Sequence, residues 1–260
     1  IYQCDWSSDV CSSDLTRMTV ISNNLANVNT TGYKRDRAVF EDLLYQRLVQ
    51  AGGQTSANTS APTGMMLGTG TKVVATEKMH AQGNMVMTQN ALDVAVSGDG
   101  FFQILQPDGT VAYTRDGSFK LSPTGQLSTS GGALLQPTIQ VPNNAESITI
   151  GADGVVSAKI FGTAQQQVLG NLQLARFINP AGLESIGQNL LRANAASGPV
   201  QQLKPGTNGA GQLVQGALEA SNVNVVEEMV NMIETQRAYE INSKAISAAD
   251  QMLKFINTNM

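Results

Sequence analysis

The C-terminal segment, residues 224–257, constrains the fold more than any other part of the chain. Its apolar residues recur at helical spacing over its whole length. Asn224 is suited to cap a helix, and Glu227 stands three residues later, as in a capping box. The pattern predicts a single helix of roughly 34 residues, about 50 Å long at ~1.5 Å per residue.

The apolar residues of this segment form two stripes that face different directions, since consecutive residues lie ~100° apart around a helix. The first stripe repeats every seven residues: Met232, Tyr239, Ile246 and Leu253. The second comprises Val226, Val230, Ile233, Ile241, Ala245, Ala248, Met252 and Phe255. Ordering the backbone costs ~1–2 kcal/mol per residue, and burying one large apolar side chain returns ~1.5–3 kcal/mol. The helix therefore needs partners on both stripes.

One short helix near the N-terminus is available as a partner. Thr16–Val28 places Met18, Ile21, Leu25 and Val28 at spacings of three and four, which predicts a helix able to pair with the C-terminal one as a coiled coil. The second stripe is then left for another copy of the protein. The alternative, that this stripe lies on the chain's own β domain, stays open at this point.

The sequence between the two ends predicts three further kinds of structure. Arg37–Val49 has the pattern of a second helical fragment, and 51–70 has the Gly, Ser, Thr and Asn content of a flexible loop. From 72 to about 178, short apolar runs alternate with turn signals, and Pro107-Asp-Gly109 predicts a hairpin turn. Residues 193–211 return to loop composition.

The predicted fold class is therefore α+β. The N- and C-terminal helices pair as a coiled coil, with an inserted all-β domain and an extended loop. The predicted segments are an N-terminal helical segment at 16–50, the extended loop at 51–71, the β-rich domain at 72–211 and the long helix at 212–260.

Residues 1–15 have no helical or strand period, and they contain both cysteines and the only tryptophan. They resemble a translated sequencing adapter, so we expect a non-native leader that lies outside the fold. The alternative is a genuine N-terminus with a Cys4–Cys11 disulfide. Without this segment the chain has no cysteine for a disulfide framework, a zinc site or a thiol nucleophile.

Composition excludes several classes of protein. An apolar content of 42% and a net charge of −4 do not fit a wholly disordered chain. With 16 Lys and Arg against 20 Asp and Glu, no basic surplus exists to neutralise phosphates, so we expect no nucleic-acid binding. No apolar run approaches ~18 residues, so we expect no membrane-spanning helix.

No catalytic, cofactor-binding or metal site emerges from the motifs. His80 is the only histidine, which excludes a multi-histidine site, and the Gly68–Lys72 segment lacks the Gly-Lys-Ser/Thr of a phosphate loop. Asp93 and Asp99 lie in a loop whose twelfth position is Ile104 in place of the glutamate that calcium requires. We therefore expect a protein without enzymatic activity and without a cofactor.

Four segments carry a family resemblance. Ser22–Lys34 (SNNLANVNTTGYK) and Gln236–Lys244 (QRAYEINSK) are similar to the N- and C-terminal signatures of bacterial flagellar rod and hook proteins. Gly98–Phe102 and Ala112–Phe119 resemble the β domain of the same family. The resemblance is specific, and it extends in continuous order over the chain after residue 15.

The resemblance implies a structural subunit that stacks helically, with its terminal helices at the centre of a tube. It implies a place in the rod of the flagellar basal body, which crosses the periplasm to the outer membrane. It also implies export through the flagellar apparatus without a cleaved signal peptide. The implied partners are further copies of the chain, proximal rod proteins, the hook protein and the surrounding ring proteins.

Within the family, the insertion at Gln46–Thr71 points to the distal rod, the drive shaft that transmits torque from the motor to the hook. Gly182–Gly187 and Asn208–Gly211 agree with this assignment. A proximal rod protein or a hook protein remains the alternative inside the family. Outside it, the alternatives are a flagellum-associated peptidoglycan hydrolase or adhesin, and a hydrolase would need paired carboxylates or a nucleophile in a cleft.

The family resemblance places two sets of residues at subunit contacts. The interface set on the terminal helices is Met18, Ile21, Asn24, Leu25, Asn27, Val28, Val230, Met232, Ile233, Gln236, Arg237, Tyr239, Asn242, Ile246, Met252 and Leu253. The set in the loop that stiffens the rod is Gln54, Pro62, Met65 and Leu67. For the asparagines the alternative is a fraying helix end, for the polar residues of the last helix it is a solvated face, and for the loop it is a flexible linker.

Overall fold

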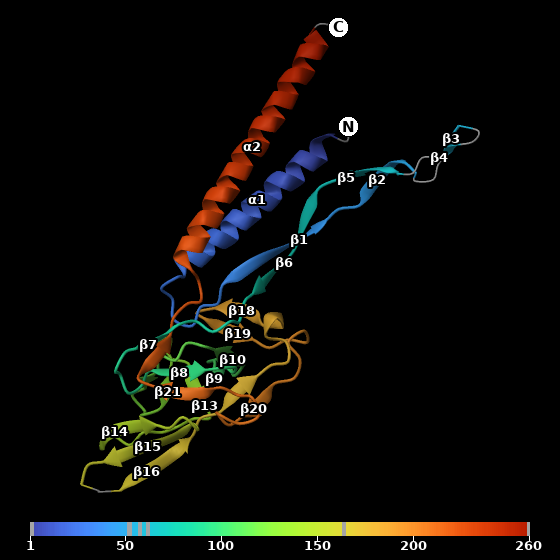
Figure 1. The fold of residues 1–260 in the computed structure, drawn as a ribbon. Coiled ribbons are helices and arrows are strands. Elements are labelled where there is room, and N and C mark those ends of the chain that lie inside the picture. Colours follow the sequence, from blue (N-terminus) through green and yellow to red (C-terminus); the bar gives the residue numbers. More distant parts are fainter. Residues whose placement is uncertain (1–2, 51–53, 57–58, 61–62, 163–164, 259–260) are drawn as a thin grey trace. The chain divides into compact units, whose positions relative to one another are not determined.

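The structure is a computed structural model that describes residues 3–50, 54–56, 59–60, 63–162 and 165–258 (Figure 1). The chain divides into two compact units. The helical unit consists of Ile1–Leu25, Asp36–Glu77 and Asn224–Met260, and the β unit consists of Ala26–Arg35 and Lys78–Val223. Each unit is therefore assembled from segments that are distant in sequence.

The helical unit contains two α-helices, α1 (Gln3–Ala26) and α2 (Val225–Thr258). The α2 helix is 34 residues long, as its apolar period predicts. The side-chain oxygen of Asn224 accepts hydrogen bonds from the backbone N–H groups of Val226 (3.1 Å) and Glu227 (3.5 Å), which confirms the predicted N-cap. Among the described residues, no helix combines the length and hydropathy that crossing a bilayer requires.

Three of the polar contacts between α1 and α2 within the described residues fix the direction of the pair. They are Asn24 to Glu228 (3.3 Å), Arg17 to Glu234 (3.8 Å) and Asn242 to Asp14 (2.9 Å). Residue numbers rise along α2 as they fall along α1, so the two helices run antiparallel, side by side (Figure 1).

The start of α1 differs from the prediction. We expected residues 1–15 to lie outside the fold, whereas α1 begins at Gln3 and Asp14 takes part in the contact with α2. Once the turn from Thr16 onward is helical, each added residue extends the helix without a new nucleation step. The helical spacing of the later residues is therefore enough to carry the helix back into this segment.

The helix predicted at Arg37–Val49 is wrong. This stretch forms β1 (Asp36–Asp42) and β2 (Tyr45–Val49), which pair with β6 (Thr71–Lys78) and β5 (Met65–Gly68). Short apolar runs do not distinguish a helix from a strand, and partner strands decide the outcome here.

The predicted loop at 51–71 also contains strands. Besides β5 it includes β3 (Gln54–Ser56) and β4 (Thr59–Ser60), which pair with each other. Together with β1, β2 and β6 they form a long hairpin extension of the helical unit (Figure 1).

The β unit contains a seven-stranded sheet in the order β11-β12-β13-β9-β10-β19-β18 and a three-stranded sheet in the order β14-β15-β16. Two-stranded pairs β8–β21, β7–β22 and β17–β20 complete it. The strands and the one short helix are β7 (Met85–Met87), β8 (Val94–Ser97), β9 (Phe102–Leu105), β10 (Val111–Thr114), β11 (Lys120–Leu121), β12 (Leu127–Ser128), β13 (Leu134–Gln136), β14 (Ala145–Ile150), β15 (Val155–Ile160), β16 (Gln166–Asn171), β17 (Leu174–Arg176), η1 (Pro180–Gly182), β18 (Glu184–Gly187), β19 (Leu190–Arg192), β20 (Gln201–Leu203), β21 (Gln212–Gln215) and β22 (Ala217–Glu219).

The hairpin predicted at Pro107-Asp-Gly109 is confirmed. β9 and β10 pair antiparallel, with Leu105 opposite Val111, and Gly109 has a φ of +83° that favours glycine in the turn. The core behind these strands is apolar. Within it the rings of Phe102 and Phe119 pack edge to face, with their centroids 5.0 Å apart. The predicted β-rich domain is thus present, although the β unit also takes in 26–35 and the strands after residue 211.

A candidate subunit interface and a buried ionic network

One face of α2 carries large apolar side chains that are mostly exposed. The exposed fractions are 70% at Val226, 58% at Val230 and 51% at Ile233, and they reach 71% at Phe255. The full set is Val226, Met229, Val230, Ile233, Ile241, Met252, Phe255 and Ile256. This set contains the large residues of the second predicted stripe, so that stripe is uncovered among the described residues. Contiguous exposed apolar surface of this kind marks an interaction site.

The opposite face of α2 is covered by α1. Glu228 and Thr235 are buried there, and Asn242 follows at the same seven-residue spacing. Met232 and Ile246 of the first stripe fall on the same side and are partly buried. Tyr239 of the same stripe is 37% exposed, so this stripe is covered only in part, whereas the second stripe is uncovered among the described residues.

The residues predicted for the interface divide between these environments. Met18, Ile21, Asn24, Leu25, Asn27, Val28, Met232, Asn242 and Ile246 are buried or partly buried within the chain. Val230, Ile233, Gln236, Arg237, Tyr239 and Met252 are exposed. The side chain of Leu253 lies outside the described residues. The exposed group alone offers surface to a second copy.

Asn24 shows why a buried member of that set has another role. Its side-chain amide donates a hydrogen bond to the carbonyl of Asp36 (2.8 Å) and accepts one from the N–H of the same residue (2.9 Å). It also donates to the Glu228 carboxylate (3.3 Å), and its exposed fraction is 1%. Asn24 therefore joins α1 to the start of β1 and to α2.

The hairpin extension exposes apolar residues on both of its faces. Leu44 is 89% exposed, and further exposed residues lie on β2 and β5: Tyr45, Leu48, Val49, Met65, Met66 and Leu67. Met65 and Leu67, predicted in a loop, lie on β5. Gln54 lies in β3, while its side chain and the whole of Pro62 are outside the described residues. A two-stranded ribbon of this composition is at best marginally stable alone in water.

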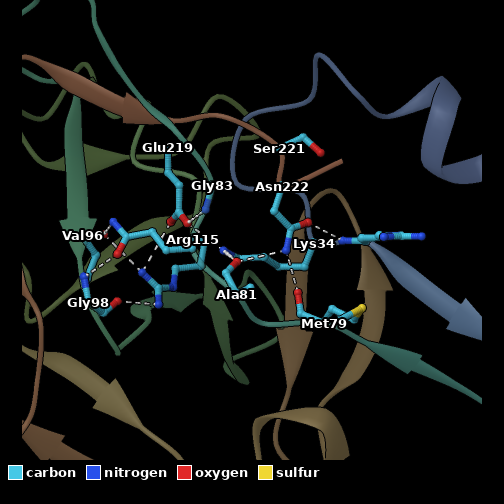
Figure 2. A network of polar contacts seen from close by, with 12 residues as sticks. Lys34, Met79, Ala81, Gly83, Val96, Gly98, Arg115, Glu219, Ser221 and Asn222 are labelled. Atoms are coloured by element: carbon cyan, nitrogen blue, oxygen red, sulfur yellow. Dashed lines mark hydrogen bonds and ion pairs between the residues drawn. The ribbon is translucent and has the colours of Figure 1, made fainter. Parts of the chain in front are cut away.

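The β unit holds a buried ionic network centred on Glu219 (Figure 2). The Glu219 carboxylate is fully buried and accepts hydrogen bonds from Lys34 Nζ (2.6 Å) and the N–H of Gly83 (2.9 Å). Arg115 Nη1 approaches its other oxygen at 3.4 Å. Lys34 and Arg115 are 4% and 5% exposed, so two cations and one carboxylate are withdrawn from water together.

Asn222 extends this network through its side-chain amide, which pairs with backbone groups as that of Asn24 does in the helical unit. Its amide oxygen accepts from the N–H of Arg35 (2.7 Å), and its nitrogen donates to the carbonyls of Met79 (2.8 Å) and Ala81 (3.0 Å) (Figure 2). In sequence, these residues stand just before β1, just after β6 and just before α2. The network therefore ties together the parts of the β unit that continue into the helical unit.

Burial sets the electrostatics of this region. Desolvation lowers the pKa of Lys34, and hydrogen bonding and charge from Glu219 oppose that shift. Desolvation also lowers the pKa of Arg115, again against the charge of Glu219. The pKa of His80 falls to about 4, first by desolvation and then by the positive charges of Lys34, Arg115 and Lys78.

Sequence reasoning did not single out the members of this network. Lys34 and Arg115 lie inside the stretches that carry the family resemblance, which was the available signal. Glu219 is one acid at the end of a short strand, and nothing in its local pattern predicts a buried partner. No cluster of metal-ligating side chains occurs among the described residues.

The chain matches three family models. The model described as flagella basal body rod protein covers residues 12–34, the flagellar hook protein FlgE/F/G D1 domain covers 95–158, and the flagellar basal body rod FlgEFG protein C-terminal model covers 214–259.

Full-length relatives decide the assignment. The chain is 54% identical to the flagellar basal-body rod protein FlgG of Buchnera aphidicola subsp. Acyrthosiphon pisum, over 91% of each chain. It is 52% identical to FlgG of Borreliella burgdorferi, over 91% of this chain and 90% of that one. The chain belongs to the FlgG family. FlgG of Bacillus subtilis, at 38% identity over 92% and 91% of the two chains, is a more distant member.

Membership in FlgG confirms the resemblance seen in the sequence. The rod and hook models match both termini and the β region, in the order that the quoted segments indicated. FlgG proteins are structural proteins of the flagellar rod, so the chain is a structural protein and not an enzyme.

Proposed function

We propose that the chain is a subunit of the distal flagellar rod that polymerises helically into the drive shaft between motor and hook. The observation that carries this proposal is the uncovered apolar face of α2. A rod subunit needs a long apolar surface that becomes buried only against further copies, and this face of α2 is such a surface.

The magnitude of the effect favours assembly. Full burial of a large apolar side chain contributes ~1.5–3 kcal/mol, so covering the exposed half of each contributes roughly 1 kcal/mol. The face carries such residues along most of α2, from Val226 to Ile256. A subunit that buried this face against its neighbours would gain several of these contributions. Together they offset part of the translational and rotational entropy that is lost on association.

The pairing of α1 and α2 as a coiled coil at the centre of the tube belongs to the same proposal. Its support is the seven-residue spacing of Glu228, Thr235 and Asn242 on the face that contacts α1. In this arrangement α1 covers the first stripe, and neighbouring subunits cover the second.

The hairpin extension is proposed to stiffen the rod. Its exposed apolar side chains on β2 and β5 would pack between neighbouring subunits, because two strands alone leave both faces in water. The proposal also includes contacts with proximal rod proteins, the hook protein and ring proteins, and export by the flagellar apparatus without a cleaved signal peptide. Membership in FlgG supports these contacts and this export route.

Electron microscopy of material polymerised from the purified chain tests the proposal. The double substitution Val230→Asp and Ile233→Asp places two carboxylates on the uncovered face and should abolish polymers, while circular dichroism of the β unit stays unchanged. Ser243→Asp, which adds one charge at an exposed position away from that face, should leave polymers intact. Normal polymers from the double variant would show that this face is not the subunit interface.

A further inference from the structure

A cavity of about 170 Å³ lies inside the β unit, next to the ionic network. The side chains that line it include His80, Asp99, Phe101, Arg115, Arg176 and Phe177. Three of these side chains are aromatic rings: the centroid of Phe101 lies 5.8 Å from that of Phe177 and 5.6 Å from that of His80, edge to face in both cases. Cationic side chains thus border a space that is partly lined by apolar rings.

The charges buried beside the cavity do not balance. Lys34 and Arg115 are two buried cations, and Glu219 is the one buried carboxylate that contacts them. Lys34 takes the short contact of 2.6 Å, whereas Arg115 has only the long one of 3.4 Å. The positive charge of Arg115 is therefore the less neutralised of the two, and Arg115 lines the cavity.

Acidic Asp99 does not remove this excess. Its side chain is 72% exposed and lies 4.0 Å from Arg176, so water and Arg176 screen its charge. Arg176 is itself 40% exposed and retains donors for another partner. The boundary of the cavity therefore stays positive overall.

Arg115 also has a hydrogen-bond donor to spare. Its two terminal nitrogens donate to the carbonyls of Gly98 (2.7 Å) and Val96 (3.3 Å), but Nε is buried with no acceptor among the described residues. A buried donor without a partner costs free energy, and native structures leave few of them unexplained. An acceptor in the cavity would relieve this cost.

We propose that this cavity binds one small oxyanion, a carboxylate or phosphate group, held by Arg115 and Arg176. Guanidinium groups bind such oxygens with paired, charge-assisted hydrogen bonds. The aromatic walls lower the local dielectric and strengthen the attraction. The proposed site consists only of residues of the β unit and does not involve the polymerisation surface. Its test can therefore fail without affecting the rod assignment.

The single histidine makes the proposal testable. His80 lines the cavity, and the cations beside it help hold its pKa near 4, so at about pH 6 the ring is neutral and reports on nearby charge. In the full chain labelled at histidine, sodium phosphate and sodium acetate should each shift the ring resonances of His80 in a saturable way. Comparison of the two salts tells whether the site favours a phosphate or a carboxylate group.

Two variants control the experiment. Arg176→Gln should weaken the apparent affinity about tenfold, the loss expected for one charge-assisted hydrogen bond. Arg192→Gln, which breaks an exposed ion pair with Glu184 elsewhere in the β unit, should leave the titration unchanged.

Thermal melting gives an independent readout, since a ligand that binds only the folded state raises the midpoint by an amount that grows with the ligand concentration. Sodium chloride at the same ionic strength should produce neither effect. Shifts that stay linear, that chloride reproduces or that Arg176→Gln retains would overturn the proposal.

Discussion

Two asparagine side chains replace missing backbone partners in this fold. Asn24 accepts from the N–H of Asp36 and donates to its carbonyl, and Asn222 accepts from the N–H of Arg35 and donates to the carbonyl of Met79. The sequence marks Asn24 as unusual, because asparagine is a poor helix former within a helical pattern. It does not reveal the partner, since Asp36 reaches Asn24 only after the chain has turned back on itself. Buried polar partners of this kind depend on tertiary geometry that local patterns do not encode.

Loss of the Glu219 charge should destabilise the β unit strongly. Glu219→Gln leaves Lys34 and Arg115 buried without their carboxylate, so we expect the free energy of unfolding to fall by about 3–5 kcal/mol. Urea denaturation followed by circular dichroism measures the change. The matched control is Glu184→Gln, which removes one partner of an exposed pair and should cost less than ~1 kcal/mol. Equal losses in the two variants would argue against a special role for the buried network.

Acid should destabilise the β unit through His80. The pKa of His80 is near 4 in the folded chain and about 6.5 when unfolded, so the unfolded state binds the proton more tightly. Stability is then lost as the pH falls from about 6.5 towards 4, by an amount on the order of 3 kcal/mol for this group. Desolvation is the largest cause of this shift, followed by the positive charges of Lys34, Arg115 and Lys78.

Denaturation curves across this pH range measure the effect. His80→Gln removes the titrating ring and should flatten the dependence between pH 6.5 and 4. An unchanged slope in the variant would mean that other groups, such as the carboxylates, account for the acid sensitivity.

At the scale of elements, length separates the helix prediction that was confirmed from the one that was wrong. The helix at 225–258 has a period sustained over many turns, and its cap and extent agree with the sequence. Arg37–Val49 has only a few apolar residues, and β-branched and aromatic side chains such as Val39 and Phe40 suit a strand equally well. Whether this stretch forms a helix or strands is decided by its pairing with β5 and β6. Both lie further along the chain, and β5 lies within the stretch whose composition resembles a loop.

The hairpin extension should govern stiffness and not assembly. Replacing Tyr45–Gly68 by a short turn removes β2 and β5 but leaves β1, β6 and the two helices. We expect such chains to polymerise into rods that bend more easily, because fewer side chains pack between neighbours. Bending measured in electron micrographs tests this, and the substitution Thr69→Ala outside the removed strands serves as a control. Rods as stiff as those of the parent chain would contradict the stiffening role.

At the scale of the molecule, the two units depend differently on their neighbours. The β unit buries its own core, which includes Phe102, Ile104 and Leu174. The helical unit leaves most large apolar residues of α2 in water. In dilute chain we therefore expect fast amide hydrogen exchange along 225–258 and slow exchange at β9 and β10. Polymerisation should slow exchange in α2 and in the hairpin extension but not at β9 and β10, whereas strong protection of α2 in the dilute chain would show that it is stable without a partner.

The hydrogen bond from Asn24 to Glu228 connects two residues that are 204 positions apart in the sequence. Because α2 follows the strands of the β unit in the chain, α1 and α2 can pair only after those strands have been made. A chain that ends before residue 225 retains every strand of the β unit but lacks α2 and its uncovered apolar face. Under the proposed assembly through α2, we therefore expect such incomplete chains not to join a polymer.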